Sequence, residues 1–380
     1  MKGGAPYKRV EKLIGKLRHA TIGVPAGKMF FTPINKILRD KPTTIQWGRY
    51  REAESAFRDL RTILKAAHAE PTHVSELVPD APDYTGWVDA SGEGVGGGWL
   101  PGKVALKPTI WRFQWPKRIT ARLVSSTNKS GDLDINDLEM AGKVLAWLVL
   151  EGLVPNLKHA HVGIFSDNMA AVSWTKRGAS RSSNVAGRLL RILGLRQRVN
   201  RSSPIVTEHL PGILNVPGDI PSRSYGNKKK WKCKHDADLL TLFHSLLPLP
   251  NQQCWRGYQL ASAITSRVIS ELETPRSTMD AWTRLPKRGK SIGADGKHTA
   301  TLSELTHTWS TQAFATECAQ QQASLGEYER AALGVARSSE LAASARHSAA
   351  STRRSPWTQG TSLCTKRAKV TNTSSPSSTC

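Results

Sequence analysis

Two aspartates end predicted buried strands, where a carboxylate is costly unless a positive group meets it, and two further acids lie at predicted helix starts. Asp89 follows the apolar run "GWV" and Asp167 follows "IFS", and apolar runs of this kind predict buried strands. Glu139 lies in "NDLEMAGKVLAW", which predicts the first turns of a helix, and Asp219 opens a later helix in "VPGDIPSRS". Taken singly, each aspartate also fits a turn or a helix N-cap, which aspartate favours.

Carboxylates that converge on one small site predict a metal centre. Like charges held close together repel, so one of the groups stays protonated unless a cation intervenes. Hard oxygen ligands suit magnesium, with manganese as an alternative. Two such ions would clamp the attacking and leaving oxygens of a phosphodiester displacement, which predicts a nuclease.

The elements that must position these acids predict a mixed α/β layer fold. A five-stranded mixed sheet is expected from strands at 84–90, 95–100, 109–115, 161–166 and 205–210. Its flanking helices are expected at about 136–152, from about 168, at about 183–199 and after 217. Gly142 and Ala146 share the helix face of Glu139, so this face can lie close against the sheet. The strand at 84–90 is expected in the middle of the sheet.

The chain divides into four segments by composition and pattern. Apolar periodicity predicts an N-terminal helical extension over residues 1–82, followed by the α/β domain at 83–227. Residues 228–317 read as a basic linker and a helical segment. Residues 318–380, rich in Ala, Ser, Gln and Thr, predict a largely disordered tail.

Composition narrows the function classes. Of the 380 residues, 39% are hydrophobic, which is enough for a core, and the net charge of +24 predicts a polyanionic partner such as nucleic acid. No run approaches the ~20 apolar residues of a membrane span, and no apolar leader opens the chain, so an intracellular place in cytoplasm or nucleus is expected. The five cysteines form no CxxC pair, which argues against a disulfide framework or a zinc site. Nothing predicts a small-molecule substrate.

Four stretches then carry a family resemblance. They are "VDASGEGVGGGW", "NDLEMAG", "SDNMAAV" and "LPGILNVPGDIPSR", in that order. Over roughly residues 7–226 the chain resembles the reverse transcriptase–RNase H region of retrotransposons. The four stretches are similar to the first strand and glycine hairpin, the first helix, the third motif and the last motif of RNase H. The resemblance implies an RNase H-like fold.

The flanking segments are similar to other parts of such elements. "KLIGKLRHA" resembles the end of a polymerase thumb, and "IQWGRYREAESAFRDLRTIL" resembles the connection that leads into RNase H. Part of residues 228–317 resembles the segment after RNase H in elements that encode tyrosine recombinases. The chain has no Tyr-x-Asp-Asp motif, so no polymerase activity is expected from it, and a separate palm domain is a candidate partner.

The resemblance implies a magnesium-dependent endonuclease that cuts the RNA strand of RNA–DNA hybrids. Asp89 would bridge two magnesium ions. Glu139 and Asp167 would hold the ion on the leaving-group side, and Asp219 would help hold the ion that activates water. His209 stands at a spacing where cellular RNases H carry a mobile histidine, although alignment on "PG" places it at the end of a strand.

Several residues are expected to contact the nucleic acid. They are Asn136, Asn168, Asn215, Arg188, Arg191, Lys228, Lys229 and Lys230. Asn136 matches a family position in the minor groove, where a 2′-hydroxyl marks RNA. Three alternatives stand beside these roles: a helix N-cap for Asn136, an exposed helix face for the arginines and a plain basic linker for the lysines.

Two other function classes compete with the nuclease. A catalytically silent nucleic-acid-binding remnant of a degenerate retroelement fits the missing palm and the low-complexity tail. A transposase or integrase of related fold fits poorly, because its glutamate would come last, whereas Glu139 comes second among the four acids.

Overall fold

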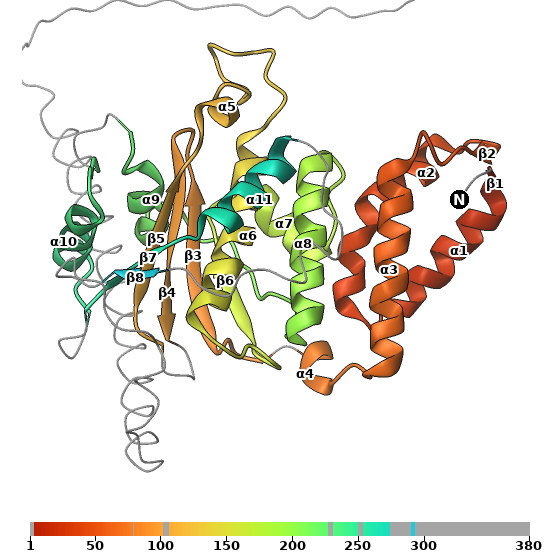
Figure 1. Ribbon diagram of the computed structural model, residues 1–380, viewed down its shortest axis with the longest axis horizontal. Coiled ribbons are helices and arrows are strands. Elements are labelled where there is room, and N and C mark those ends of the chain that lie inside the picture. Colours follow the sequence, from red (N-terminus) through yellow and green to blue (C-terminus); the bar gives the residue numbers. More distant parts are fainter. Residues whose placement is uncertain are drawn as a thin grey trace, which may run out of the picture. The chain divides into compact units, whose positions relative to one another are not determined.

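The computed structural model describes residues 4–78, 80–101, 106–226, 231–249, 254–273 and 290–292. All of these residues belong to one compact unit, Met1–Ser324. The unit contains a mixed sheet with helices on both faces and, next to it, an N-terminal group of helices (Figure 1). Within these described ranges, no helix is long and apolar enough to cross a bilayer.

Among the described residues, the main sheet has six strands in the order β6-β3-β4-β5-β7-β8. Its first four strands are β3 (Tyr84–Ala90), β4 (Gly94–Pro101), β5 (Thr109–Gln114) and β6 (Val162–Phe165). β3 pairs antiparallel with β4 and parallel with β6, and β4 pairs antiparallel with β5. The mixed α/β sheet and the interior place of β3 are therefore confirmed.

The strand expected at 205–210 is present only as isolated bridges, from Val206 to Gly163 in β6 and from His209 to Ser166, which follows β6. Beside these bridges the hydroxyl of Thr207 donates to the carbonyl oxygen of Ile164 at 2.7 Å. A regular parallel ladder would bring a backbone N–H from two residues after Val206 to that oxygen. The segment thus lies where the fifth strand is expected, without forming a full strand.

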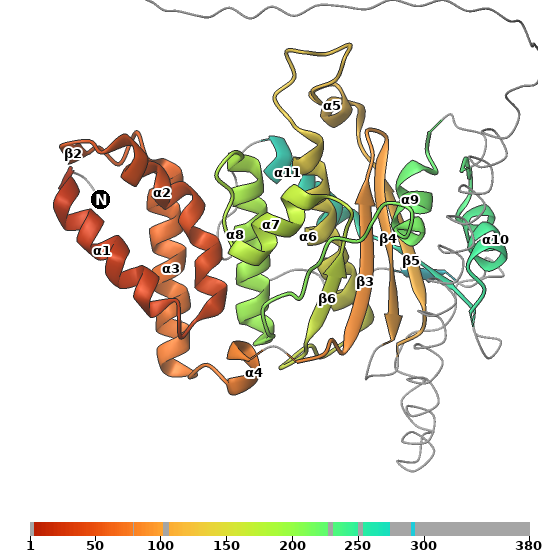
Figure 2. The same ribbon diagram turned by 180° about the vertical axis from the view of Figure 1, so that it is seen from behind.

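Helices cover both faces of the sheet. They are α5 (Lys117–Thr120), α6 (Ile135–Leu153), α7 (Met169–Arg177), α8 (Asn184–Asn200) and α9 (Val216–Arg223). Asp134, Asn168 and Ser183 cap the starts of α6, α7 and α8 with their side chains, and Gly178 ends α7 in the left-handed region. α6, α7 and α8 lie on one side of the sheet and α9 on the other (Figure 2).

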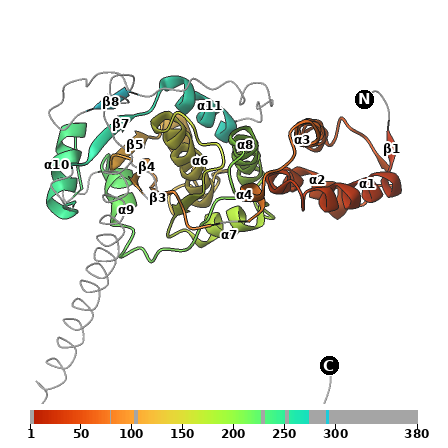
Figure 3. The same ribbon diagram turned by 90° about the horizontal axis from the view of Figure 1, so that it is seen from below.

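The N-terminal segment packs against α8. It consists of β1 (Ala5–Pro6), α1 (Tyr7–Ala20), η1 (Pro25–Phe30), α2 (Phe31–Asp40), β2 (Thr44–Ile45), α3 (Arg51–Ala69) and α4 (Val74–Leu77). Two glycines of α8 allow the contact, because a Cβ on Gly187 would lie 2.4 Å from Thr32 and one on Gly194 would lie 2.7 Å from the Ala26 oxygen. One hydrophobic core therefore runs from these helices through α8 and α6 to the sheet (Figure 3).

The described residues beyond 230 are built into the same fold. They form α10 (Asp236–Leu246), β7 (Arg256–Gln259), α11 (Ser262–Glu273) and β8 (Lys290–Ile292). β7 pairs parallel with β5, and α11 packs on α6 and α8. The two helices agree with the sequence, whereas β7 extends the sheet by a strand that the sequence does not predict. The expected tail at 318–380 lies outside the described residues.

Candidate metal centre

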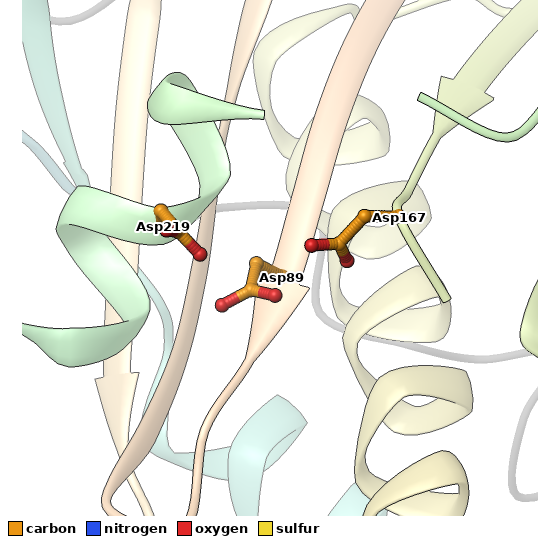
Figure 4. Close-up of side chains that lie close together, drawn as sticks. All are labelled: Asp89, Asp167 and Asp219. Carbon is orange, nitrogen blue, oxygen red and sulfur yellow. The ribbon is translucent and has the colours of Figure 1, made fainter. Parts of the chain in front are cut away.

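Three carboxylates meet at one edge of the sheet. Asp89 lies near the end of β3, Asp167 follows β6, and Asp219 lies in the first turn of α9. β3 and β6 are parallel neighbours, so their carboxyl ends reach the same edge. One oxygen from each aspartate lies within 4.8 Å of the others, and Asp89 lies between Asp167 and Asp219 (Figure 4). These residues are called the acid triad below, and they are three of the four acids that were expected to converge.

The glycines of β4 allow α9 to bring Asp219 to the triad. A Cβ on Gly96 would lie 2.4 Å from the Cβ of Pro221, and one on Gly94 would lie 3.1 Å from the Ser222 oxygen. α9 therefore packs against the backbone of β4, which carries no side chain at these two positions. The glycine-rich stretch after Asp89 thus positions an acid that follows more than a hundred residues later.

Glu139 lies behind the triad in α6. Its side chain is buried, it accepts a hydrogen bond from the Ala90 backbone, and its Oε2 lies 3.5 Å from the Ser166 hydroxyl. The small face of α6 permits this approach, because a Cβ on Gly142 would lie 2.9 Å from Val88 on β3. Glu139 is outside the group of three converging carboxylates, so its place as a direct metal ligand stays a prediction.

Burial and the charges of neighbouring carboxylates shift Asp89 and Glu139 toward their protonated forms. Burial raises the pKa of Asp89 to about 7, and the charges of Asp219 and Asp167 add to the rise while a hydrogen bond from Ser222 opposes it. Burial, with the charges of Asp89 and Asp167, raises the pKa of Glu139 well above its usual range. A divalent cation would replace these protons and relieve the repulsion, so the all-oxygen donor set fits a hard cation.

Two residues of α9, three and four positions after Asp219, also touch the acids. The buried hydroxyl of Ser222 donates to Asp89 Oδ2, and Arg223 Nη2 lies 2.8 Å from Asp219 Oδ1. The hydroxyl of Ser91 in turn donates to the Ser222 carbonyl oxygen at 2.8 Å. Sequence reasoning assigns no role to Ser222 and Arg223, although both belong to the last family-like stretch.

Sequence reasoning also missed a second cation next to the acids, which is a buried lysine. Lys143 is fully buried, and its Nζ donates to the Thr207 hydroxyl at 2.6 Å. Burial lowers its pKa to about 7, while the charge of Glu139 opposes the shift. The available signal is a lysine inside the otherwise apolar stretch "MAGKVLAWLVL".

The three asparagines occupy different places. Asn136 and Asn168 form an amide pair beside Asp167, with Asn168 Nδ2 2.8 Å from Asn136 Oδ1, and both are partly exposed. Asn136 is not the cap of α6, because Asp134 holds that position. Asn215 is fully buried and donates to the Val88 oxygen at 3.3 Å, so its amide is not offered to a surface ligand.

The arginines of α8 face the N-terminal helices. Arg188 pairs with Glu52, and Arg191 pairs with Asp59 and donates to Ser55. Arg188 is 9% and Arg191 5% exposed, so neither the expected contact with nucleic acid nor an exposed helix face describes them. The charges are buried because the partner helix α3 meets them, which a helical pattern alone does not reveal.

The remaining sequence-predicted residues are placed as follows. His209 is exposed and bridges Ser166 through its backbone, which agrees with the alignment that ends a strand there. Lys228, Lys229 and Lys230 lie outside the described residues.

Comparison with protein-family models, curated proteins and solved structures gives no match to this chain. The interpretation of the site therefore depends on its own geometry and on the resemblance of its motifs.

Proposed function

We propose that this chain is a magnesium-dependent endonuclease that cleaves the RNA strand of RNA–DNA hybrids, as part of a retroelement reverse transcriptase. The observation that carries the proposal is the acid triad, whose oxygens lie within 4.8 Å of one another at the edge of the sheet. Order along the chain and placement on β3, after β6 and on α9 agree with the RNase H-like resemblance. When bound, two divalent cations would activate a water molecule and stabilise the leaving oxygen of the phosphodiester.

Each acidic residue would have a role that follows from its position in the site. Asp89 lies between Asp167 and Asp219, which supports the proposal that its carboxylate would contact both cations. Glu139 and Asp167 would complete the leaving-group side, and Asp219 would complete the side of the attacking water. Ser222 holds Asp89 by its Oδ2 atom and so fixes the direction of the remaining oxygen.

Substrate choice is proposed from the residues next to Asp167. The amide pair of Asn136 and Asn168 is partly exposed there, and amides can both donate to and accept from a 2′-hydroxyl. A 2′-hydroxyl in the minor groove distinguishes an RNA strand from DNA. The net charge of +24 favours association with a polyanion of either kind.

The test is cleavage of an end-labelled RNA–DNA hybrid by the whole chain, with magnesium or manganese and with a DNA duplex of the same sequence beside it. We expect cuts in the RNA strand alone. Asp89→Asn should lower the rate by orders of magnitude, because it removes one charge from the centre at constant side-chain volume. Glu208→Gln, which neutralises an exposed carboxylate, is the matched control and should cleave normally.

The same experiment also tests the competing function. A catalytically silent remnant would bind hybrid and DNA duplex alike and cleave neither. Absence of cleavage with both metals, from a folded chain that binds the hybrid, would overturn the nuclease proposal in favour of that remnant.

A further inference from the structure

Arg223 approaches the triad from its more exposed side. It lies one helical turn after Asp219, and its Nη2 is 2.8 Å from Asp219 Oδ1. The side chain of Arg223 is 40% exposed and that of Asp219 is 24% exposed. Both side chains therefore reach solvent in part, although the Asp219 Oδ1 atom and the Arg223 Nε atom are themselves buried.

Arg223 is a permanent charge beside these acids. Burial raises the pKa of Asp219, and the charge of Arg223 opposes that rise. The other neighbouring cation, Lys143, has its pKa lowered by burial to about 7, so it is only partly charged at neutral pH. A guanidinium carries a permanent positive charge, so Arg223 offsets part of the negative charge of the triad.

The Arg223 side chain is less firmly held than a structural arginine nearby. Arg112 donates to Asp236 at 2.8 Å and to Ser224 and the Cys233 oxygen at 2.9 Å each. In contrast, the Nε atom of Arg223 is buried without a hydrogen-bond partner among the described groups. The Arg223 guanidinium can thus leave Asp219 without breaking a network of this kind.

We infer that Arg223 competes with a divalent cation for Asp219, an inference that rests on the metal-dependent function proposed above. Without metal, the guanidinium supplies part of the positive charge that the triad needs. Within the described residues Asp89 and Asp167 form no ion pair, so a first cation binds on their side without displacing a charge. A second cation that used Asp219 Oδ1 would have to displace Arg223 from that oxygen.

The test is a magnesium titration of the whole chain, followed by the midpoint of thermal unfolding. Arg223→Gln should unfold at a lower temperature without metal, because the acids then repel one another more. It should also need about two- to five-fold less magnesium for half-maximal stabilisation, the range expected for loss of an exposed ion pair. Arg223→Lys, which keeps the charge, should lie close to the unmodified chain.

Two controls make the result specific. Arg58→Gln breaks a comparable pair with Glu54 in α3, at 2.5 Å and also four residues apart, and should leave the magnesium requirement unchanged. In an Asp219→Asn background, Arg223→Gln should no longer shift the requirement, because the contested carboxylate is absent.

The outcomes separate this inference from the proposed function. If Asp89→Asn removes the magnesium effect while Arg223→Gln leaves the requirement unchanged or raises it, the metal centre stands and the competition is wrong. If magnesium stabilises neither the unmodified chain nor any variant, both the metal centre and the competition are overturned.

Discussion

Gly96 of β4 and Pro221 of α9 lie so close that a methyl group on Gly96 would sit 2.4 Å from the Cβ of Pro221. The same added atom would lie 2.8 Å from the Trp111 carbonyl oxygen. Neither neighbour is the far end of a flexible side chain, so the contact can be relieved only by moving α9 or the strand. Asp219 belongs to α9. The position of its carboxylate therefore depends on the absence of a side chain at Gly96.

Gly96→Ala is expected to lower the free energy of unfolding by about 1–3 kcal/mol, the usual cost of overpacking. It should also lower hybrid cleavage far more than this loss of stability explains, because α9 must move. Gly98→Ala is the matched control, since its added methyl group would meet no atom closer than 3.4 Å. Urea unfolding and cleavage rates measured on both variants decide the matter, and equal behaviour of the two would contradict this role of Gly96.

The stability of the metal-free chain should fall between about pH 4 and pH 7. Burial raises the pKa of Asp89 to about 7, so the folded chain keeps a proton that the unfolded chain has already released. Stability falls wherever the folded state binds more protons, by up to about 1.4 kcal/mol per pH unit for one group. Asp89→Asn removes this contribution, so the variant should gain stability over the unmodified chain as pH rises through this window. Urea unfolding in chelator at several pH values measures the difference, and a constant difference would refute the shift.

Lys143 should produce the opposite slope at higher pH. Burial lowers its pKa to about 7, so between pH 7 and its ordinary value the unfolded chain binds the extra proton. Stability should therefore rise with pH across that window, again by up to about 1.4 kcal/mol per pH unit. In Lys143→Met the rise should be absent, and the gain over the unmodified chain should be largest at pH 7 and below. A rise of equal slope in Lys143→Met, measured by urea unfolding, would show that another group causes it.

The sequence predicted the positions of the acids because each belongs to a strong local pattern. Asp89 and Asp167 end apolar runs that form β3 and β6, and Glu139 shares a helix face with Gly142 that can approach a sheet. The parallel pairing of β3 with β6 then brings the two aspartates to one edge. Local pattern and chain order were enough for this part of the site.

Contacts between segments that are far apart in the chain could not be predicted from local sequence patterns. Arg191 reads as an exposed base on a helix until Asp59, far away along the chain, is placed against it. The hydrogen bond from Ser222 to Asp89 likewise needs α9 to lie on β4. β7 was missed because its short run "RGYQ" has little apolar character and depends on pairing with β5.

The shared core also changes how the protein should be studied. The sequence predicts a separate α/β domain at residues 83–227. In the structure, α8 buries Arg191 against Asp59 of α3, and removal of a partner from a buried pair typically costs about 3–5 kcal/mol. The whole chain is therefore the form of the protein to test.

The central claim is that Asp89, Asp167 and Asp219 hold a divalent cation, and electron paramagnetic resonance of manganese tests it most directly. Free manganese gives a strong signal that weakens on binding, so bound ions can be counted without any cleavage. We expect the whole chain to bind manganese in competition with magnesium, and Asp89→Asn to lose most of that binding while Glu208→Gln keeps it. Equal manganese binding by the unmodified chain and Asp89→Asn would contradict the metal centre.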